Sequence, residues 1–136
     1  MQPIITYETH TVGEPTRIVV EGFPIPEGST MMEKKDYLEK HYDHLRTALL
    51  CEPRGHKDMV GALITSPCNP AADIGVIFID SYRWINMCGH ASMGCAYTAV
   101  KAGIVKSSGA DTEIKIDTPA GLVRVHVNPD TRECTL

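Results

Sequence analysis

The sequence predicts an α/β (α+β) fold in which a β-sheet surrounds a central helix and a second helix lies on the surface. Two helical stretches of opposite character support this prediction. Residues 31–50 carry one apolar face among many charged residues, whereas residues 89–102 are rich in small residues on several sides. Apolar segments with a period of two flank them, which is typical of strands. A chain of 136 residues is long enough for one such domain with a hydrophobic core.

The predicted strands are indicated by alternation and by the turn residues between them. Gly13 and Pro15 in the link HTVGEP favour a turn between the first two strands. The segment GVIFID is nearly all apolar, as expected for a strand that is buried on both faces. NPDTR favours a hairpin turn, after which ECTL would begin a returning strand. Strands are expected at residues 3–9, 16–21, 59–65, 75–80, 113–117 and 122–127.

The surface helix is expected to begin after Thr30, which has capping-box spacing with Glu33. Pro53 enforces its end, because proline cannot continue a helix. Charged residues occupy the rest of its surface, so this helix is expected to pack on a sheet with one face in water. Its predicted apolar face consists of Leu38, Tyr42, Leu45 and Leu49.

The central helix is expected to span residues 89–102 and to be capped by Gly103, because glycine suits the end of a helix. Its side chains are unusually small, so other elements can approach it closely from several sides. This favours a helix wrapped by a sheet over a helix on the surface. The small residues are Ala91, Ser92, Gly94, Cys95, Ala96, Ala99 and Ala102.

Composition excludes several classes of protein. The net charge of −4 gives no basic surface for nucleic acid, and no basic amphipathic stretch points to a membrane surface. No apolar run approaches the roughly 20 residues of a membrane span. The start, MQPIITYETH, lacks the features of a secretory signal. We therefore expect a cytoplasmic protein that binds neither nucleic acid nor membrane.

The five cysteines are odd in number and form no CxxC pair, which argues against a disulfide framework and against a zinc site. We therefore expect free thiols and no metal. Most of these thiols should be buried and inert, so a reactive one needs a special environment. The cysteines are Cys51, Cys68, Cys88, Cys95 and Cys134.

The segment MCGHASMG places a thiol and an imidazole at the predicted start of the central helix. There the Cys88 thiol would lie near backbone N–H groups that have no partner in the helix and near the positive end of its dipole. Both favour a thiolate, so we expect the pKa of Cys88 to fall from about 8.5 toward neutrality. The dipole alone contributes roughly 0.3–1 kcal/mol, so further donors are needed.

The same N–H groups can bind a substrate carboxylate. A thiolate beside a bound carboxylate is suited to removing the proton from the adjacent carbon, as a general base and not as a nucleophile. Three roles are open for His90, two residues later: it donates to the substrate, it tunes the thiolate, or it packs.

Four segments of the chain resemble the proline racemase family, which comprises cofactor-independent racemases and epimerases of proline and hydroxyprolines. They occur in the order and at the spacing of that family and cover most of the chain. The segments are THTVGEPTRIVVEGFP (9–24), EPRGHKDMVGAL (52–63), ADIGVIFID (72–80) and MCGHASMG (87–94).

The resemblance implies two similar halves, each a strongly curved, mostly antiparallel sheet around a central helix, as in diaminopimelate epimerase. It implies a site between the halves, with one cysteine at the tip of each helix. One thiolate takes the α-proton while the opposite thiol returns a proton to the other face, so no cofactor is needed. Cys88 matches the first-half cysteine, and Gly89 and His90 match residues that hold the substrate carboxylate and line the pocket.

The chain departs from the family in one catalytic group. The second-half cysteine, which in the family lies in a segment like SPCGTG, is absent from these 136 residues. Cys134 has no neighbouring glycine, and Cys95 lies about two helical turns beyond Cys88, so neither replaces it. We therefore expect residues 1–136 to be the N-terminal half of a two-domain racemase or epimerase, inactive alone. The expected partners are the missing C-terminal half and a small imino acid, with a second copy of the chain as a further candidate.

The segment DMVG departs from the family at Val60, where proline racemases resemble DMFG or DMYG with an aromatic ring against the substrate. Valine leaves space for a hydroxyl group and so favours 4-hydroxyproline slightly over proline, unless Val60 is a strand residue of the core. Two other functions stay open. One is a trans-3-hydroxy-L-proline dehydratase, in which a threonine replaces the second cysteine, and the other is a non-catalytic half that binds a ligand or another subunit.

Overall fold

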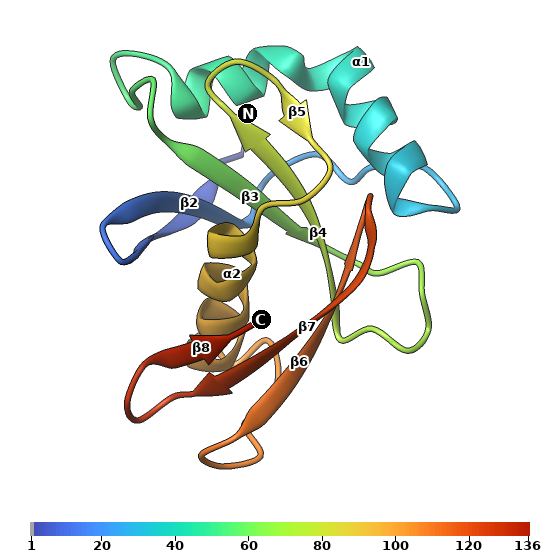
Figure 1. The fold of residues 1–136 in the computed structure, drawn as a ribbon. Coiled ribbons are helices and arrows are strands. Elements are labelled where there is room, and N and C mark those ends of the chain that lie inside the picture. Colours follow the sequence, from blue (N-terminus) through green and yellow to red (C-terminus); the bar gives the residue numbers. More distant parts are fainter. Residues whose placement is uncertain (1) are drawn as a thin grey trace.

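The computed structural model describes residues 2–136 and shows a curled sheet with one helix inside the curl and another on its outer face (Figure 1). The predicted strands and both predicted helices are present, with small shifts at their ends. In chain order the elements are β1 (Ile5–Thr11), β2 (Glu14–Glu21), α1 (Met31–Leu50), β3 (Val60–Thr65), β4 (Ile74–Asp80), β5 (Trp84–Ile85), α2 (Gly89–Lys101), β6 (Thr112–Thr118), β7 (Gly121–Asn128) and β8 (Glu133–Thr135).

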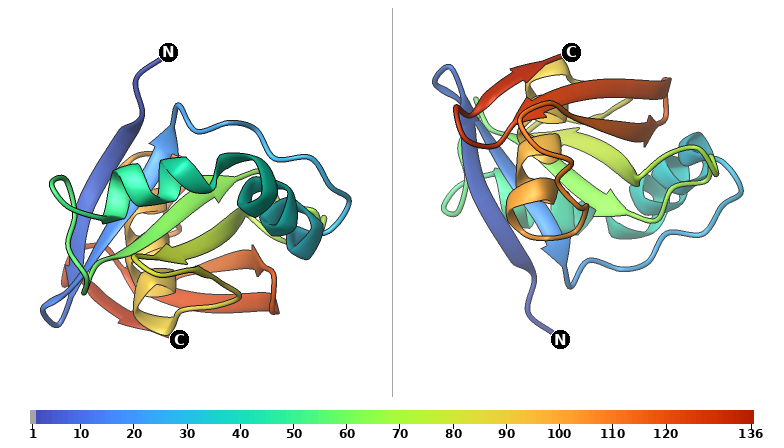
Figure 2. Two further views of the ribbon diagram at one scale, coloured as in Figure 1. Left: turned by 90° about the horizontal axis from the view of Figure 1, so that it is seen from above. Right: turned by 90° about the horizontal axis from the view of Figure 1, so that it is seen from below.

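The sheet has the strand order β1-β2-β3-β4-β6-β7-β8, and the short β5 pairs with β4. The pairs β2–β3 and β4–β6 are parallel, and the other pairs are antiparallel. The sheet curls so that α2 contacts β1 to β4 and also β6 to β8 (Figure 2). The prediction of a strongly curved, mostly antiparallel sheet around a central helix is therefore confirmed.

The helix α2 fits inside this curl because its side chains are small. Ala91, Ala96 and Ala99 are completely buried. A Cβ atom at Gly94 would come within 3.1 Å of Oγ1 of Thr9, so the strand β1 approaches the helix closely. The helix ends in a Schellman motif at Gly103 (φ +74°), as predicted. In this motif the amide of residue 104 donates to the carbonyl of Ala99 at 2.9 Å.

The helix α1 covers the outer face of the sheet. Its capping box is present, because the Thr30 hydroxyl accepts from the amide of Glu33 and the Glu33 carboxylate accepts from the amide of Thr30. Tyr42 has a non-helical backbone (φ −134°, ψ 24°) and is half-buried, and it still packs against the core beneath α1 as part of the predicted apolar face. Leu38, Leu45 and Leu49 are buried as predicted. Among residues 2–136, neither helix is long and apolar enough to cross a membrane.

The strand β4 is shared by two hydrophobic cores, which explains why GVIFID is nearly all apolar. Val76 and Phe78 pack in the core around α2. Ile77 and Ile79 pack in a second core beneath α1. Since successive side chains of a strand point to opposite faces, both faces of β4 are buried, as the sequence predicts.

The first hairpin is tighter than predicted. Only Val12 and Gly13 separate β1 from β2, and both have positive φ (51° and 86°), as a type I′ turn requires. Pro15, expected in the link, pairs with His10 inside the ladder. The hairpin therefore extends β1 as far as Thr11, whose hydroxyl donates to the carbonyl of His90 at 3.1 Å.

Candidate active site

Cys88 is the N-cap residue of α2. Its backbone is extended (φ −144°, ψ 120°), and the helix begins at the next residue, Gly89. The Cys88 carbonyl accepts from the amide of Ser92 at 2.9 Å and from its hydroxyl at 2.8 Å, which fixes the backbone at the cap. The thiol is half-buried, and its Sγ lies 3.3 Å from Nδ1 of His90. The predicted position of this thiol at the head of the central helix is therefore confirmed.

The strands β2, β3 and β4 place further side chains at the end of the sheet where β2 and β3 begin and β4 ends. Thr16 of β2 lies beside Val60 of β3, which in turn lies opposite Asp80 of β4. Alternate residues of a strand share a face. Thr16, Val60 and Asp80 therefore point to the α2 side of the sheet, and Glu14 does so for the same reason. The residues two positions further into the sheet pack around α2, namely Ile18, Ala62 and Phe78.

The protonation state of Cys88 differs from the prediction. Burial raises the pKa of the Cys88 thiol above its ordinary value, and the charges of Glu14 and Asp80 act in the same direction. The backbone amides of Ala91 and His90 lower the pKa but do not outweigh burial. The predicted fall in pKa is therefore wrong for this chain, because desolvation of the sulfur disfavours the thiolate more than the start of the helix favours it.

Packing leaves the first turn of α2 open at Gly89. A Cβ atom at Gly89 would meet nothing closer than Cδ2 of Leu136, at 3.8 Å, so packing does not require glycine there. The first N–H groups of a helix have no partner within it and can bind an anion. His90 is half-buried and is tied to β1 through its carbonyl, while its ring stays beside the thiol. The structure thus brings Cys88, Gly89 and His90 together.

Val60, the fourth predicted site residue, lies at the start of β3. Its side chain is half-buried and packs against the core around α2. This position fits both the wall of a substrate pocket and the edge of the core.

The other thiols have different environments from Cys88. Cys95 is completely buried among the apolar residues around α2, and burial raises its pKa far above the ordinary range of a thiol. Burial also raises the pKa of Cys134. Within residues 2–136, no group of three or more His, Cys, Asp or Glu residues is placed to hold a metal ion.

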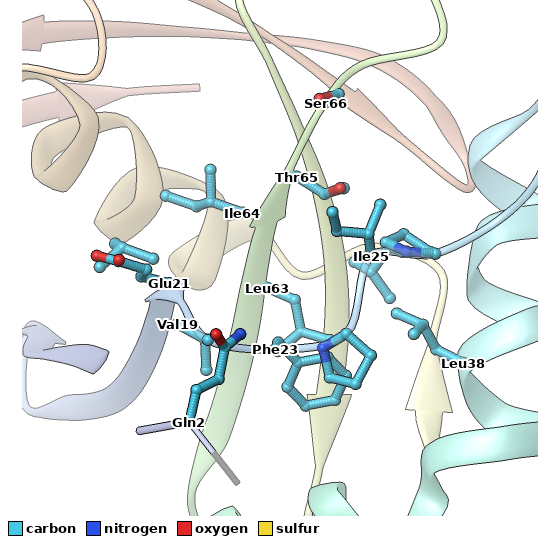
Figure 3. A pocket seen from close by; sticks show the side chains of 15 residues that line it. Gln2, Val19, Glu21, Phe23, Ile25, Leu38, Leu63, Ile64, Thr65 and Ser66 are labelled. Carbon is cyan, nitrogen blue, oxygen red and sulfur yellow. The ribbon is translucent and has the colours of Figure 1, made fainter. Parts of the chain in front are cut away.

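Among the grooves elsewhere on the chain are two beside the sheet. One, of about 330 Å³, lies between the loop at residues 22–26, strands β2 and β3, and α1 (Figure 3). The other, of about 640 Å³, lies between β1 and β8 along the exposed side of α2. Cys88 lines neither groove, so neither is the candidate site.

Glu14, Thr16 and Asp80 were missed as neighbours of the site. Asp80 could have been recognised as a site residue from the sequence, because it is a polar residue at the end of a buried strand. Glu14 and Thr16 could not, because their position depends on the pairing of β2 with β3. Thr16 is only 1% exposed, and its hydroxyl has no hydrogen-bond partner among residues 2–136.

The raised pKa of Cys88 predicts slow alkylation at neutral pH. Only the thiolate reacts, so the alkylation rate should rise with pH and reach half its maximum above about pH 8.5, the value of an ordinary thiol. The measurement is the rate of iodoacetamide labelling of the Cys88 peptide across the neutral to alkaline range, with the chain in denaturant as control. A midpoint below about pH 7 would instead show that the dipole of α2 outweighs the burial of the sulfur.

Replacement of Thr16 by valine should stabilise the protein. An unpartnered buried hydroxyl is unfavourable, so Thr16→Val is expected to raise the free energy of unfolding by about 1 kcal/mol. Thr118 is the matched control, because it is equally buried but donates to the carbonyl of Gly121 at 2.7 Å. Thr118→Val should therefore destabilise by about 1–3 kcal/mol. Denaturant unfolding measures both, and a loss of stability in Thr16→Val would reveal a partner for that hydroxyl.

The chain is similar in sequence to known proteins over most of its length. A family model described as proline racemase matches residues 6–136. The chain is 52% identical over 120 residues to the proline racemase of Acetoanaerobium sticklandii, a match that covers 88% of this chain and 36% of that protein. It is 45% identical over 120 residues to the 4-hydroxyproline 2-epimerase of Cereibacter sphaeroides, with the same coverage of 88% and 36%.

A crystal structure gives the same result for the fold. The probable proline racemase from Agrobacterium radiobacter K84 superposes with a TM-score of 0.86 and 27% identity, over 93% of this chain and 38% of that one. The chain thus spans little more than a third of the length of these relatives. On the evidence of the family match and of the sequence identities, this chain belongs to the proline racemase family.

Proposed function

We propose that this chain is the N-terminal half of a cofactor-independent racemase or epimerase of a cyclic imino acid, in which Cys88 is one of two acid/base groups. The observation that carries the proposal is the position of the Cys88 thiol at the head of α2, beside helix amides that packing leaves open at Gly89. A thiol and an anion-binding turn so close together suit chemistry at the carbon next to a carboxylate.

The substrate carboxylate would bind the first amides of α2, with His90 beside it. Its α-carbon would then lie next to Sγ of Cys88. Glu14 and Asp80 point to the same side of the sheet, so their negative charge favours a substrate whose nitrogen is cationic. A zwitterionic imino acid meets both requirements.

Burial of the sulfur, which raises the pKa of Cys88, supports a part for this residue as the proton donor in one direction of the reaction. As a thiol, Cys88 would donate a proton to one face of the α-carbon. A thiolate on the opposite face, supplied by the second half, would remove the original α-proton. The product has the inverted configuration, and the two sulfurs have exchanged protonation states. The reverse reaction then uses Cys88 as the base.

The second acid/base group is expected in the C-terminal half, since the sequence has no SPCGTG-like segment. The proposed partner of this chain is therefore that half of the same protein, and a homodimer of the whole enzyme is a further candidate. All five cysteines are free in the structure, which supports a reducing, cytoplasmic location.

Val60 supports a slight preference for 4-hydroxyproline over proline. Its side chain faces the α2 side of the sheet at the level of Asp80, near the head of α2. Valine is smaller than the aromatic residue of DMFG or DMYG and would leave room for the ring hydroxyl group.

Exchange of the α-proton with solvent tests the proposed reaction. The protein that contains both halves should incorporate deuterium at the α-carbon of proline and 4-hydroxyproline in heavy water, as measured by NMR. Cys88→Ser should lower this exchange about 100- to 10,000-fold, because a serine hydroxyl is a far poorer acid and base. Cys68→Ser, at a half-buried thiol away from the site, is the control and should keep full exchange.

Residues 1–136 alone should show no exchange, because the second group is missing. Exchange by this chain alone, or full exchange by Cys88→Ser in the complete protein, contradicts the mechanism. Loss of water from trans-3-hydroxy-L-proline, without exchange of the other imino acids, would support a dehydratase instead.

Substitution at Val60 tests the substrate preference. Val60→Phe fills the proposed space for the hydroxyl group, so the ratio of kcat/KM for 4-hydroxyproline to that for proline should fall by about 10-fold. Ile64→Phe is the matched control, because Ile64 lies on the same face of β3, four residues further from the site, and is also half-buried. An unchanged ratio in Val60→Phe would place Val60 in the core and outside the pocket.

A further inference from the structure

A hydrogen-bonded network joins α1 to the short strand β5 on the outer face of the sheet. The carboxylate of Asp43 accepts from Arg46 at 2.7 Å (Nε) and 3.2 Å (Nη2), and from the indole N–H of Trp84 at 2.7 Å. The hydrogen bond from Arg46 is the main cause that lowers the pKa of Asp43, so this carboxyl is ionised at neutral pH. Arg46 is only 7% exposed and Trp84 only 6%, so most of the network is buried.

The same arginine also holds the turn that leads into β5. Nη1 of Arg46 donates to the carbonyl of Asp80, the last residue of β4, at 3.1 Å. The carboxylate of Asp80 accepts from the amides of Tyr82 at 2.8 Å and Arg83 at 2.7 Å. The turn between β4 and β5 is therefore fixed from both the α1 side and the α2 side.

The strand β5 connects this network to the candidate site. It consists of Trp84 and Ile85 only, which pair with Ile79 and Phe78 of β4. Trp84 packs in the core beneath α1, whereas Ile85 packs in the core around α2. Figure 1 shows the chain running from β5 beneath α1 directly to the head of α2. Only residues 85–87 separate the hydrogen-bonded indole from Cys88.

We propose that Asp43, Arg46 and Trp84 are positioning residues that set the location of the Cys88 thiol through β5. This proposal rests on the proposed role of Cys88 as an acid/base group. The packing of α2 fixes the helix after the thiol, and the network fixes the chain before it. A two-residue strand has too few ladder hydrogen bonds to do this alone, so the bonds from α1 complete its anchoring.

The chemistry of the network favours positioning over simple stabilisation. The Asp43 side chain is 48% exposed, and an ion pair with one partner in water contributes little to stability, so the pair is not needed for stability alone. The two hydrogen bonds from the Arg46 guanidinium and the one from the Trp84 indole restrict the orientation of β5 relative to α1 as well as the distance between them. Proton transfer needs such accuracy, since a displacement of about 1 Å can lower the rate about 100-fold.

Two substitutions in the protein that contains both halves test the proposal. Asp43→Asn keeps the shape of a partly exposed side chain but removes its charge. Trp84→Phe keeps an aromatic ring but removes the N–H donor. Each should lower kcat for α-proton exchange about 10-fold or more with little change in KM, because positioning acts on the reacting atoms and not on carboxylate binding. Each should also shift the midpoint pH of Cys88 alkylation, because a displaced sulfur changes both its burial and its distance from the helix amides.

The double variant should be no worse than the more damaged single variant, because both changes break the same connection. Arg17→Lys is the matched control. Arg17 also binds the last turn of α1, through the carbonyl of Leu49, and the carbonyl of Arg54 beyond it, but its other partner is Glu8 on β1. Arg17→Lys should lower the melting temperature and leave kcat and the Cys88 alkylation midpoint unchanged.

The outcomes separate this proposal from the proposed function. If Asp43→Asn and Trp84→Phe lower only the melting temperature, as Arg17→Lys does, the network is structural and the positioning proposal is overturned. If the unaltered protein exchanges no imino acid but both variants shift the alkylation of Cys88, the positioning proposal stands and the proposed function falls.

Discussion

The close packing of α2 inside the curled sheet is the constraint on which the candidate site depends. Ala91, Ala96 and Ala99 have no exposed surface, and β1 lies so near that even a Cβ atom at Gly94 would crowd Thr9. Packing this dense leaves the helix little freedom to slide or rotate, because either movement would bring it against the side chains of Thr9 and Ile18. The first turn of α2 is therefore held at the end of the sheet where β2 and β3 begin and β4 ends. The position of the Cys88 thiol thus follows from residues whose side chains carry no reactive group.

The same packing decides the protonation state of that thiol. A helix N-terminus stabilises a nearby negative charge by about 0.3–1 kcal/mol, which corresponds to less than about one pKa unit. Burial of an ionisable group can shift its pKa by several units in the opposite direction. Cys88 is half-buried and also faces the charges of Glu14 and Asp80, so the thiol form is favoured. The N-terminus of α2 therefore favours a thiolate at Cys88 but does not outweigh the burial of the sulfur.

Sequence periodicity predicted the helices, the strands and the position of Cys88, because these depend on neighbours along the chain. The small residues of α2 predicted its central place for the same reason. The sign of the pKa shift was not predictable in this way, because burial of the sulfur arises only when β2, β3 and β4 meet at α2. Glu14 and Thr16 became neighbours of the site through strand register, which single-sequence patterns do not specify. Likewise, nothing near Asp43 in the sequence indicates that it binds the indole of Trp84.

A protonated thiol in one half is compatible with two-base chemistry, because two facing sulfurs can share one proton. When two acidic groups lie close together, ionisation of one raises the pKa of the other, so the pair holds a single proton over a wide pH range. Inversion at carbon requires that state, with a base on one face and an acid on the other. In the proposed enzyme, the raised pKa of Cys88 in this half biases the shared proton toward its sulfur. The group from the second half then begins as the base, and each turnover reverses the assignment.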